Sequence, residues 1–184
     1  MSRLPPIDRE ALSPAQSEVY NRIATGARGG VRGPFLALLH SPGLAARIEQ
    51  LGVYVRFQCA VPERLRELAI LTVAAHWRCD YEWYAHAPLA ERLGLPEGTL
   101  AQLGRGETPE FEDPSDALVR DYCATLLREG RVPDALYNRT RELLGQQGIV
   151  DLTGLVGYYT LLALTLNGHE VAAPGDTQIP WHAA

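Results

Sequence analysis

The sequence lacks an uninterrupted apolar run long enough to cross a membrane. Its longest apolar stretches are 68–75 and 152–166, and Thr153, Gly154 and Thr160 are among the residues that interrupt the second. A membrane-spanning helix needs about 20 consecutive apolar residues. Residues 1–9 also lack the apolar centre and the small-residue cleavage site of a secretory signal. We therefore expect a cytoplasmic protein without membrane contact.

Cysteine and clustered positive charge are also scarce. The chain has 3 cysteines, Cys59, Cys79 and Cys123, among 184 residues. An odd count in a chain of this size predicts no disulfide framework and is typical of a reducing compartment. The net charge is −5, and the arginines are scattered rather than gathered into a basic stripe. Nucleic acid is therefore not expected as a partner.

The sequence does contain repeated helix start and stop signals. Alternating apolar and polar runs flanked by hairpin turns are hard to find, so we predict one all-α domain over 1–184. Ser13-Pro14-Ala15-Gln16 has the spacing of a capping box with proline at the first helical position. The expected helices are 13–27, 35–40, 41–57, 62–77, 79–93, a short one near 103, 115–128, 133–144 and an apolar one ending near 166.

Several segments stand out from this helical pattern. Residues 1–12 should form an extended arm and 168–184 an irregular tail, and the glycines of 145–148 predict a turn. The glycine-rich stretch 28–34 reads as a loop that brings backbone close to another group. Residues 68–75 are apolar on every side, which a helix tolerates only when other helices cover it, so this should be the central helix.

The predicted helix 79–93 carries titratable side chains on one face. At about 100° per residue, one stripe of this helix comprises Cys79, Glu82, Trp83, His86, Ala90 and Leu93. Because the stripe is apolar at its far end, packing should turn it inward. On the preceding helix, Glu67 is aligned with Ile70, Leu71 and Ala74 at offsets typical of one apolar face. A second inward carboxylate is therefore expected.

Two carboxylates beside one histidine are suited to acid–base chemistry. Glu82 precedes His86 by one helical turn, so its carboxylate is expected to hold one imidazole nitrogen and leave the other for a substrate. With Glu67 nearby, the pKa values of these groups are pushed apart, and one pocket can hold a proton donor and an acceptor together. The alternative is a Glu82–His86 pair that is satisfied within the core and has no chemical role.

These residues resemble the motif of the carboxymuconolactone decarboxylase superfamily. The similar segments are Arg66-Glu67-Leu68, an apolar helix, and Cys79-Asp80-Tyr81-Glu82-Trp83-Tyr84-Ala85-His86 followed by Ala90 and Gly94. The superfamily includes AhpD-like alkylhydroperoxidases, whose motif places Glu and then Cys-x-x-Cys-x-x-x-His at the spacing of Glu67, Cys79 and His86. Glu82 occupies the position of the second cysteine, so the sequence is a Cys-x-x-Glu variant.

The resemblance implies an all-α, AhpD-like bundle of packed helical hairpins that assembles into a homotrimer or homohexamer. It also implies a lyase that uses no metal and no organic cofactor. Such an enzyme would decarboxylate, isomerise or hydrolyse a small carboxylated lactone or ring-cleavage product of aromatic-acid breakdown.

Roles for individual residues follow from this implied chemistry. His86 is expected to donate the proton, Glu82 to orient it, and Glu67 to tune its charge or position a water. Arg32, in the glycine-rich loop, is a candidate to hold the substrate carboxylate; the alternative is a solvated loop arginine. The remaining candidates, for the pocket wall and for substrate binding, are Cys79, Trp77 and Trp83.

Three other interpretations stay open from the sequence. Cys79 could act with Cys59, or with an external thiol, in a peroxiredoxin-like thiol oxidoreductase. A metal site is conceivable but not expected; its ligands would be His76, Cys79, Glu82 and His86. The chain could also be a non-catalytic oligomeric binding protein in which the motif survives only as packing.

Overall fold

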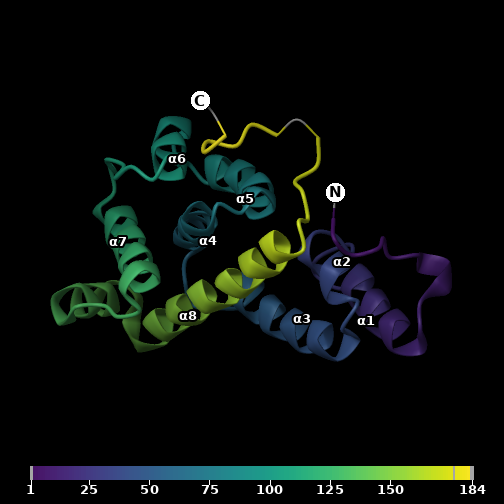
Figure 1. Cartoon of the computed structure of the whole chain (residues 1–184). Helices are drawn as coiled ribbons and strands as arrows, with labels where there is room; N and C mark the ends of the chain where they lie inside the picture. Colours follow the sequence, from purple (N-terminus) through teal and green to yellow (C-terminus); the bar gives the residue numbers. More distant parts are fainter. Residues whose placement is uncertain (1, 176, 183–184) are drawn as a thin grey trace.

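The computed structural model describes residues 2–175 and 177–182, and within these ranges it contains helices and no strands. The all-α prediction is thus confirmed (Figure 1). The elements are η1 (Arg9–Ala11), α1 (Pro14–Thr25), α2 (Pro34–Leu38), α3 (Pro42–Phe57), α4 (Glu63–Trp77), α5 (Asp80–Arg92), α6 (Glu97–Gly104), α7 (Pro114–Glu129) and α8 (Asp134–Gly168).

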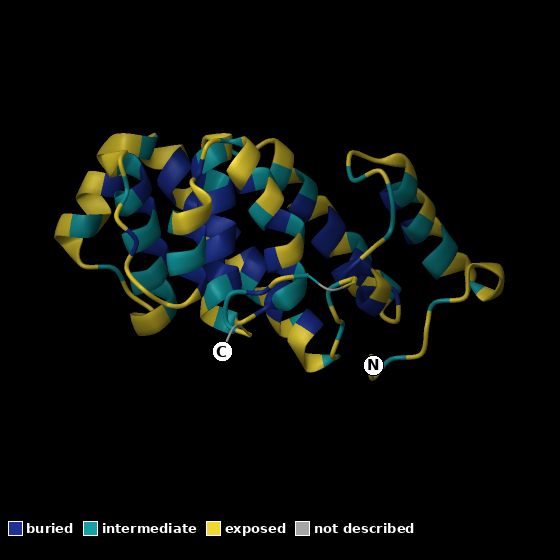
Figure 2. Cartoon of the chain, turned by 90° about the horizontal axis from the view of Figure 1, so that it is seen from above, coloured by how far each residue is buried: buried dark blue, intermediate teal, exposed yellow. Residues whose placement is uncertain are grey.

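Helix α4 is the central element, as its apolar sequence predicted. It packs against α5, α6, α7 and α8 and lies between them in Figure 1. The side chains of Leu68, Ile70 and Leu71 have no exposed surface. Figure 2 shows the buried residues along the middle of the molecule and the exposed ones on its outer surfaces. Any functional side chain on the inner faces of α4 and α5 is therefore close to the centre of the fold.

Local sequence signals fix the ends of α1 and α7. Ser13 and Gln16 form the predicted capping box at the start of α1. Asp113 caps α7 through the backbone N–H of Ser115, and α7 ends at Gly130, which adopts a left-handed conformation.

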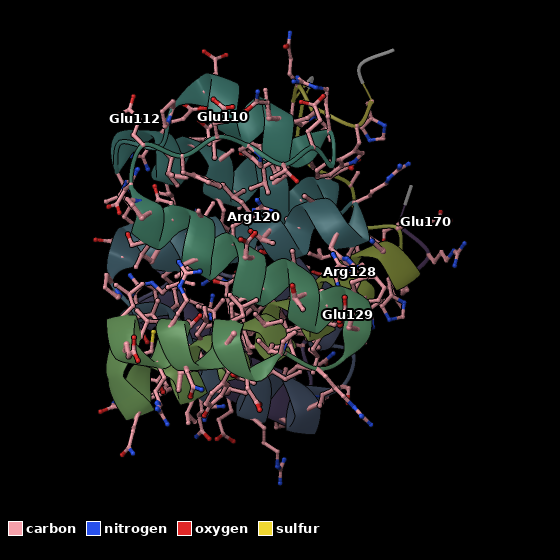
Figure 3. The ribbon with its side chains drawn as sticks, turned by 90° about the vertical axis from the view of Figure 1, so that its left-hand side faces the viewer. Glu110, Glu112, Arg120, Arg128, Glu129 and Glu170 are labelled. Atoms are coloured by element: carbon pink, nitrogen blue, oxygen red, sulfur yellow. The ribbon has the colours of Figure 1, made fainter. Side chains whose placement is uncertain are left out.

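The outer surface beside α7 is charged: Figure 3 labels Glu110 and Glu112 on the preceding loop, and Arg128 and Glu129 at the end of the helix.

Helix α8 is interrupted at a single residue. Gly145 has φ 73° and ψ 177°, so the turn predicted over 145–148 is reduced to one glycine, and the two segments of α8 run in different directions (Figure 1). Within the described residues, α8 is the one helix long and apolar enough to cross a membrane. More than half of its most apolar stretch is buried inside the fold, and buried core helices commonly meet the same criterion.

The predicted arm contains one short helix, and the described part of the tail after α8 is irregular; both are attached to the helices by hydrogen bonds. The arm includes the short helix η1, and Arg3 holds it against the end of α8 by donating to the carbonyl oxygens of Gly168 and His169. The tail runs back to α5, where Trp181 Nε1 donates to Asp80 Oδ1 at 2.8 Å. Residues 1, 176 and 183–184 of these two predicted segments lie outside the described residues.

The central position of α4 predicts a graded loss of stability at Ile70. Because Ile70 is fully buried, Ile70→Val should lower the free energy of unfolding by about 0.5–1.5 kcal/mol and Ile70→Ala by about 2–5 kcal/mol. Urea denaturation followed by circular dichroism measures both values. Equal, negligible losses for the two variants would contradict the central placement of α4.

Candidate functional site

The side chain of His86 lies between two carboxylates in the buried centre of the molecule. Its Nδ1 is 2.5 Å from Glu67 Oε2, and its Nε2 is 3.4 Å from Glu82 Oε2. The exposed fractions of Glu67, His86 and Glu82 are 3%, 2% and 4%. The structure therefore brings the three predicted acid–base residues together.

The α4–α5 hairpin produces this arrangement. Arg78 ends α4 in a left-handed conformation, with φ 47° and ψ 51°, and the backbone N–H of Cys79 donates to the carbonyl oxygen of Ala74. The chain then reverses direction, so Glu67 on α4 faces His86 on α5 across the hairpin. Glu82 reaches the opposite ring nitrogen because it lies one turn before His86 on the same helix.

The roles of the two carboxylates differ from the prediction. The sequence placed Glu82 as the group that orients the ring, whereas Glu67 makes the short hydrogen bond. An ionised carboxylate can only accept, so this contact places a proton on Nδ1 and fixes the ring. Glu82 lies instead beside Nε2, the nitrogen expected to be left for a substrate.

The carboxyl group of Glu82 is perturbed by its buried position beside His86. Burial raises the pKa of Glu82, while His86, Arg56 and Arg28 oppose that rise through their positive charge. The 3.4 Å contact between His86 Nε2 and Glu82 Oε2 therefore places an imidazole nitrogen beside a carboxyl group whose pKa is raised by burial. Such a pair can deliver a proton to a ligand and recover it afterwards.

Glu82 and His86 open onto a pocket of about 580 Å³, called the His86 pocket below. The volume lies in the usual range for small-molecule sites. Helix α8 contributes Tyr159 and Leu162 to the lining, while the glycine-rich loop and the end of α3 contribute the arginines Arg28, Arg32 and Arg56. The pocket thus combines a proton-transfer pair with positive charge suited to an anionic ligand.

The three arginines are held differently. Arg28 donates to the hydroxyl of Tyr158 at 3.0 Å and lies over the ring of Phe35. A glycine is required beneath this contact, because a Cβ on Gly52 would lie 2.1 Å from the Tyr158 hydroxyl oxygen and 2.2 Å from Arg28 Nη2. Arg32 is exposed and donates to the carbonyl of Gly29.

Arg56 differs from the other two arginines. Its side chain is partly buried and lines the pocket, but unlike Arg28 and Arg32 it donates no hydrogen bond within the described part of the chain. Its positive charge acts on the pKa of Glu82. Arg56 is therefore the arginine most available to a ligand carboxylate.

Three predicted wall residues do not line the His86 pocket. Trp83 packs edge-to-face on Trp181 and lines a separate pocket of about 870 Å³ beside the C-terminal tail. Trp77 donates to Thr160 Oγ1, and Cys79 is fully buried against Ala163 and Leu166 on α8.

Two physical causes explain the observed positions of Cys79 and Trp83. Cys79 is the N-cap of α5 and has an extended backbone, so the helical angles that placed it on the stripe do not apply to it. The predicted stripe is also wide enough to divide between two buried surfaces. Glu82 and His86 face the pocket, whereas Trp83 and Ala90 pack on α4 and α6 residues.

The sequence reasoning missed Arg28, Arg56 and Tyr159. Arg28 lies in the same glycine-rich loop as Arg32, so the argument made for Arg32 applied to it too. Tyr159 was detectable as a hydroxyl within an apolar helix. Arg56 carried no signal, because its position depends on how the end of α3 packs near α5.

Comparison with known proteins identifies the fold class of the chain and a related family. The chain has the AhpD-like helical fold, and the match of residues 42–109 to the Carboxymuconolactone decarboxylase family confirms the resemblance predicted from the motif. A comparison with curated proteins gives no match. The family match covers α3 to α6 and therefore includes Glu67, Glu82 and His86.

Solved structures share the fold at low sequence identity. A peroxidase-related protein of Ralstonia eutropha JMP134 with an alkylhydroperoxidase AhpD core is 18% identical, with a TM-score of 0.77 over 95% of this chain and 93% of that one. A peroxidase-related protein of Silicibacter sp. TM1040 is 14% identical, with a TM-score of 0.73 over 92% and 90%. A variant of the debrominase Bmp8, in complex with 2,3,4-tribromopyrrole, is 12% identical, with a TM-score of 0.70 over 99% and 97%.

The cysteines are poorly arranged for redox chemistry. Burial, with Glu82 nearby, raises the pKa of Cys79 to about 12. Cys59 precedes α4 and Cys79 follows it, and a helix of 15 residues spans about 22 Å. Among the described residues, no group of three or more His, Cys, Asp and Glu side chains is placed to hold a metal ion. His76, a ligand in the metal interpretation, is exposed.

Thiol labelling tests the environment of Cys79. At pH 8 a thiol with a pKa near 12 is ionised in about one molecule in 10⁴, so Cys79 should resist iodoacetamide in the native protein. The partly exposed Cys59 should react first, and all three cysteines should react in denaturant. Peptide mass mapping after timed labelling distinguishes them. Native labelling of Cys79 as fast as Cys59 would contradict the buried placement.

The raised pKa of Glu82 predicts a pH-dependent stability. In the unfolded chain Glu82 titrates near its ordinary value of 4.5, while in the folded chain it holds its proton to higher pH. The free energy of unfolding should therefore fall as pH rises above 4.5 through the raised value, and Glu82→Gln should remove this part of the fall.

Denaturation of the wild type, Glu82→Gln and the exposed control Glu91→Gln across this pH range measures the effect. The wild type should lose stability relative to Glu82→Gln as pH rises, and Glu91→Gln should follow the wild type. A constant difference between the wild type and Glu82→Gln would show that Glu82 is not perturbed by burial.

Proposed function

We propose that this protein is an enzyme that performs cofactor-free acid–base chemistry on a small carboxylated ring compound. The particular reaction proposed is decarboxylation, or a related isomerisation or hydrolysis, of a carboxylated lactone or ring-cleavage product. The observation that carries the proposal is the buried group Glu67–His86–Glu82, in which His86 hydrogen-bonds Glu67 and lies 3.4 Å from Glu82, beside a pocket lined by three arginines. The match to the Carboxymuconolactone decarboxylase family supports it.

Binding and proton transfer can be divided among these residues. Arg56, supported by Arg28 and Arg32, would pair with a substrate carboxylate, because a guanidinium matches the geometry of a carboxylate. A carboxylate turned toward Glu82 is less well solvated and repelled, which favours its loss as carbon dioxide. The electron pair left behind moves into the conjugated carbonyl of the ring.

The proton needed to complete the reaction would come from the Glu82–His86 pair. Both Glu82 and His86 line the pocket, so a bound ligand can lie beside them. After the carbon dioxide has left, His86 would protonate the ring carbon through Nε2, and Glu67 would keep the ring in position through Nδ1. Solvent then restores the proton, so one proton is taken up for each carbon dioxide released.

A thiol oxidoreductase is the less favoured alternative. Two solved structures with this fold are peroxidase-related proteins, and this similarity supports the alternative. A working thiol, however, needs access and a lowered pKa, and Cys79 has neither.

The debrominase structure contains a small bromopyrrole, so at least one protein of this fold accepts a small ring compound.

The remaining predictions about this protein stay proposals. We propose that it forms a homotrimer or homohexamer, works in the cytoplasm, and binds a small carboxylate rather than nucleic acid or membrane. The non-catalytic binding protein is the alternative against which the enzyme must be tested.

A substrate panel and one histidine substitution test the function. The wild type is assayed on carboxylated lactones and ring-cleavage acids for carbon dioxide release, and on alkyl hydroperoxide with a thiol donor. His86→Gln should lower kcat/KM for the carboxylated substrate by about 10²–10⁴-fold, because the proton donor is lost. The control is His76→Gln, which changes an exposed histidine away from the pocket.

The outcomes separate the alternatives. Turnover of a carboxylated substrate that is lost in His86→Gln and kept in His76→Gln supports the lyase. Peroxide consumption that depends on Cys79 would favour the oxidoreductase. No turnover on any substrate, with tight binding of a carboxylate, would favour the binding protein.

A further inference from the structure

The hydroxyl of Tyr159 has no hydrogen-bond partner in the described part of the chain, although the residue as a whole is almost fully buried. The side chain, on α8, is 2% exposed, yet its hydroxyl makes no hydrogen bond within residues 2–175 and 177–182. Its neighbour Tyr158, by contrast, accepts a hydrogen bond from Arg28. The Tyr159 hydroxyl is therefore free to bond a group from outside the protein.

The position of Tyr159 relates it to the proton-transfer pair. Its ring packs edge-to-face on the ring of His86, with 5.3 Å between centroids and an interplanar angle of 89°. Tyr159 lines the His86 pocket together with Glu82 and His86. Protein atoms do not fully enclose the hydroxyl oxygen of Tyr159. The open space that this side chain borders is the His86 pocket.

The chemistry of the hydroxyl is that of a donor. Burial and the nearby Glu82 carboxylate raise the pKa of Tyr159 well above its ordinary value. The group therefore keeps its proton under any ordinary condition. It can donate a hydrogen bond to a ligand oxygen, but it cannot act as a base.

We propose that Tyr159 is a further catalytic residue, which donates a hydrogen bond to the carbonyl oxygen of the substrate beside His86. This inference rests on the proposed function and narrows its substrate class. The substrate must carry a carbonyl conjugated to the carbon that loses the carboxylate, so that the carbonyl oxygen and that carbon reach Tyr159 and His86 together.

The electron balance of the step assigns each residue one task. The bond between the ring carbon and the carboxylate breaks, and its electron pair moves through the conjugated system to the carbonyl oxygen, which becomes an enolate oxygen. The Tyr159 hydroxyl stabilises this negative charge by its hydrogen bond. When His86 protonates the carbon, the electrons return and the carbonyl is restored, with no oxidant or reductant consumed.

Tyr159→Phe tests this role with a matched control beside it. The substitution removes one oxygen and keeps the ring that packs on His86. Loss of one such donor should lower kcat by about 10²–10³-fold with little change in KM. The control Tyr158→Phe removes the hydroxyl that holds Arg28, so it should raise KM more than it lowers kcat. Circular dichroism and Tm confirm that both variants fold.

A binding measurement decides the donor role without turnover. Titration of 4-nitrophenol, followed by the absorbance of the phenolate, reports how well the pocket stabilises a phenolate oxygen. Tyr159→Phe should weaken phenolate binding by about tenfold or more relative to the wild type, because one hydrogen bond to a charged group is lost. Tyr158→Phe should weaken it less.

The results distinguish failure of this inference from failure of the proposed function. If Tyr159→Phe keeps wild-type kcat while His86→Gln is inactive, the enzyme stands and the role of Tyr159 is overturned. If no substrate is turned over, the proposed function fails, and the phenolate titration alone decides whether Tyr159 donates into the pocket. Equal phenolate affinity in the wild type and Tyr159→Phe overturns the inference in either case.

Discussion

The hydrogen bond between Glu67 and His86 determines what the rest of the site can do. It joins α4 to α5 in the buried centre, and it holds one ring nitrogen so that the other faces Glu82 and the pocket. Burial of two carboxylates in an apolar helix pair is unfavourable unless both find partners, and the imidazole supplies a partner to each. The three side chains thus partner one another at the buried centre of the fold.

The electrostatics around this group favour an anionic ligand. Arg28, Arg32 and Arg56 border the pocket, while Glu82 and His86 form its proton-transfer edge. Because Gly52 has no side chain, Arg28 can reach the Tyr158 hydroxyl, and this hydrogen bond fixes the position of the Arg28 guanidinium. Positive charge suited to binding and a histidine–carboxylate pair suited to proton transfer therefore border one small space, which is what the proposed carboxylated substrate requires.

Much of the fold could be predicted from local sequence, because capping and turn signals act locally. Ser13, Pro42 and Gly145 marked helix boundaries close to those observed. The inward placement of Glu82 and His86 followed from helical periodicity. The direction of Cys79 did not, because an N-cap residue leaves the helical path, and the contribution of Arg56 and Tyr159 depended on tertiary packing between α3, α5 and α8.

The most direct test of the account is the state of the His86 ring, observed by NMR in protein labelled with ¹⁵N-histidine and assigned with His86→Gln. The account predicts a proton on Nδ1 that is strongly deshielded by Glu67 and protected from exchange with water, together with an Nε2 signal that responds when a carboxylate ligand is added. A ring whose two nitrogens both exchange freely and do not respond to ligand would contradict it.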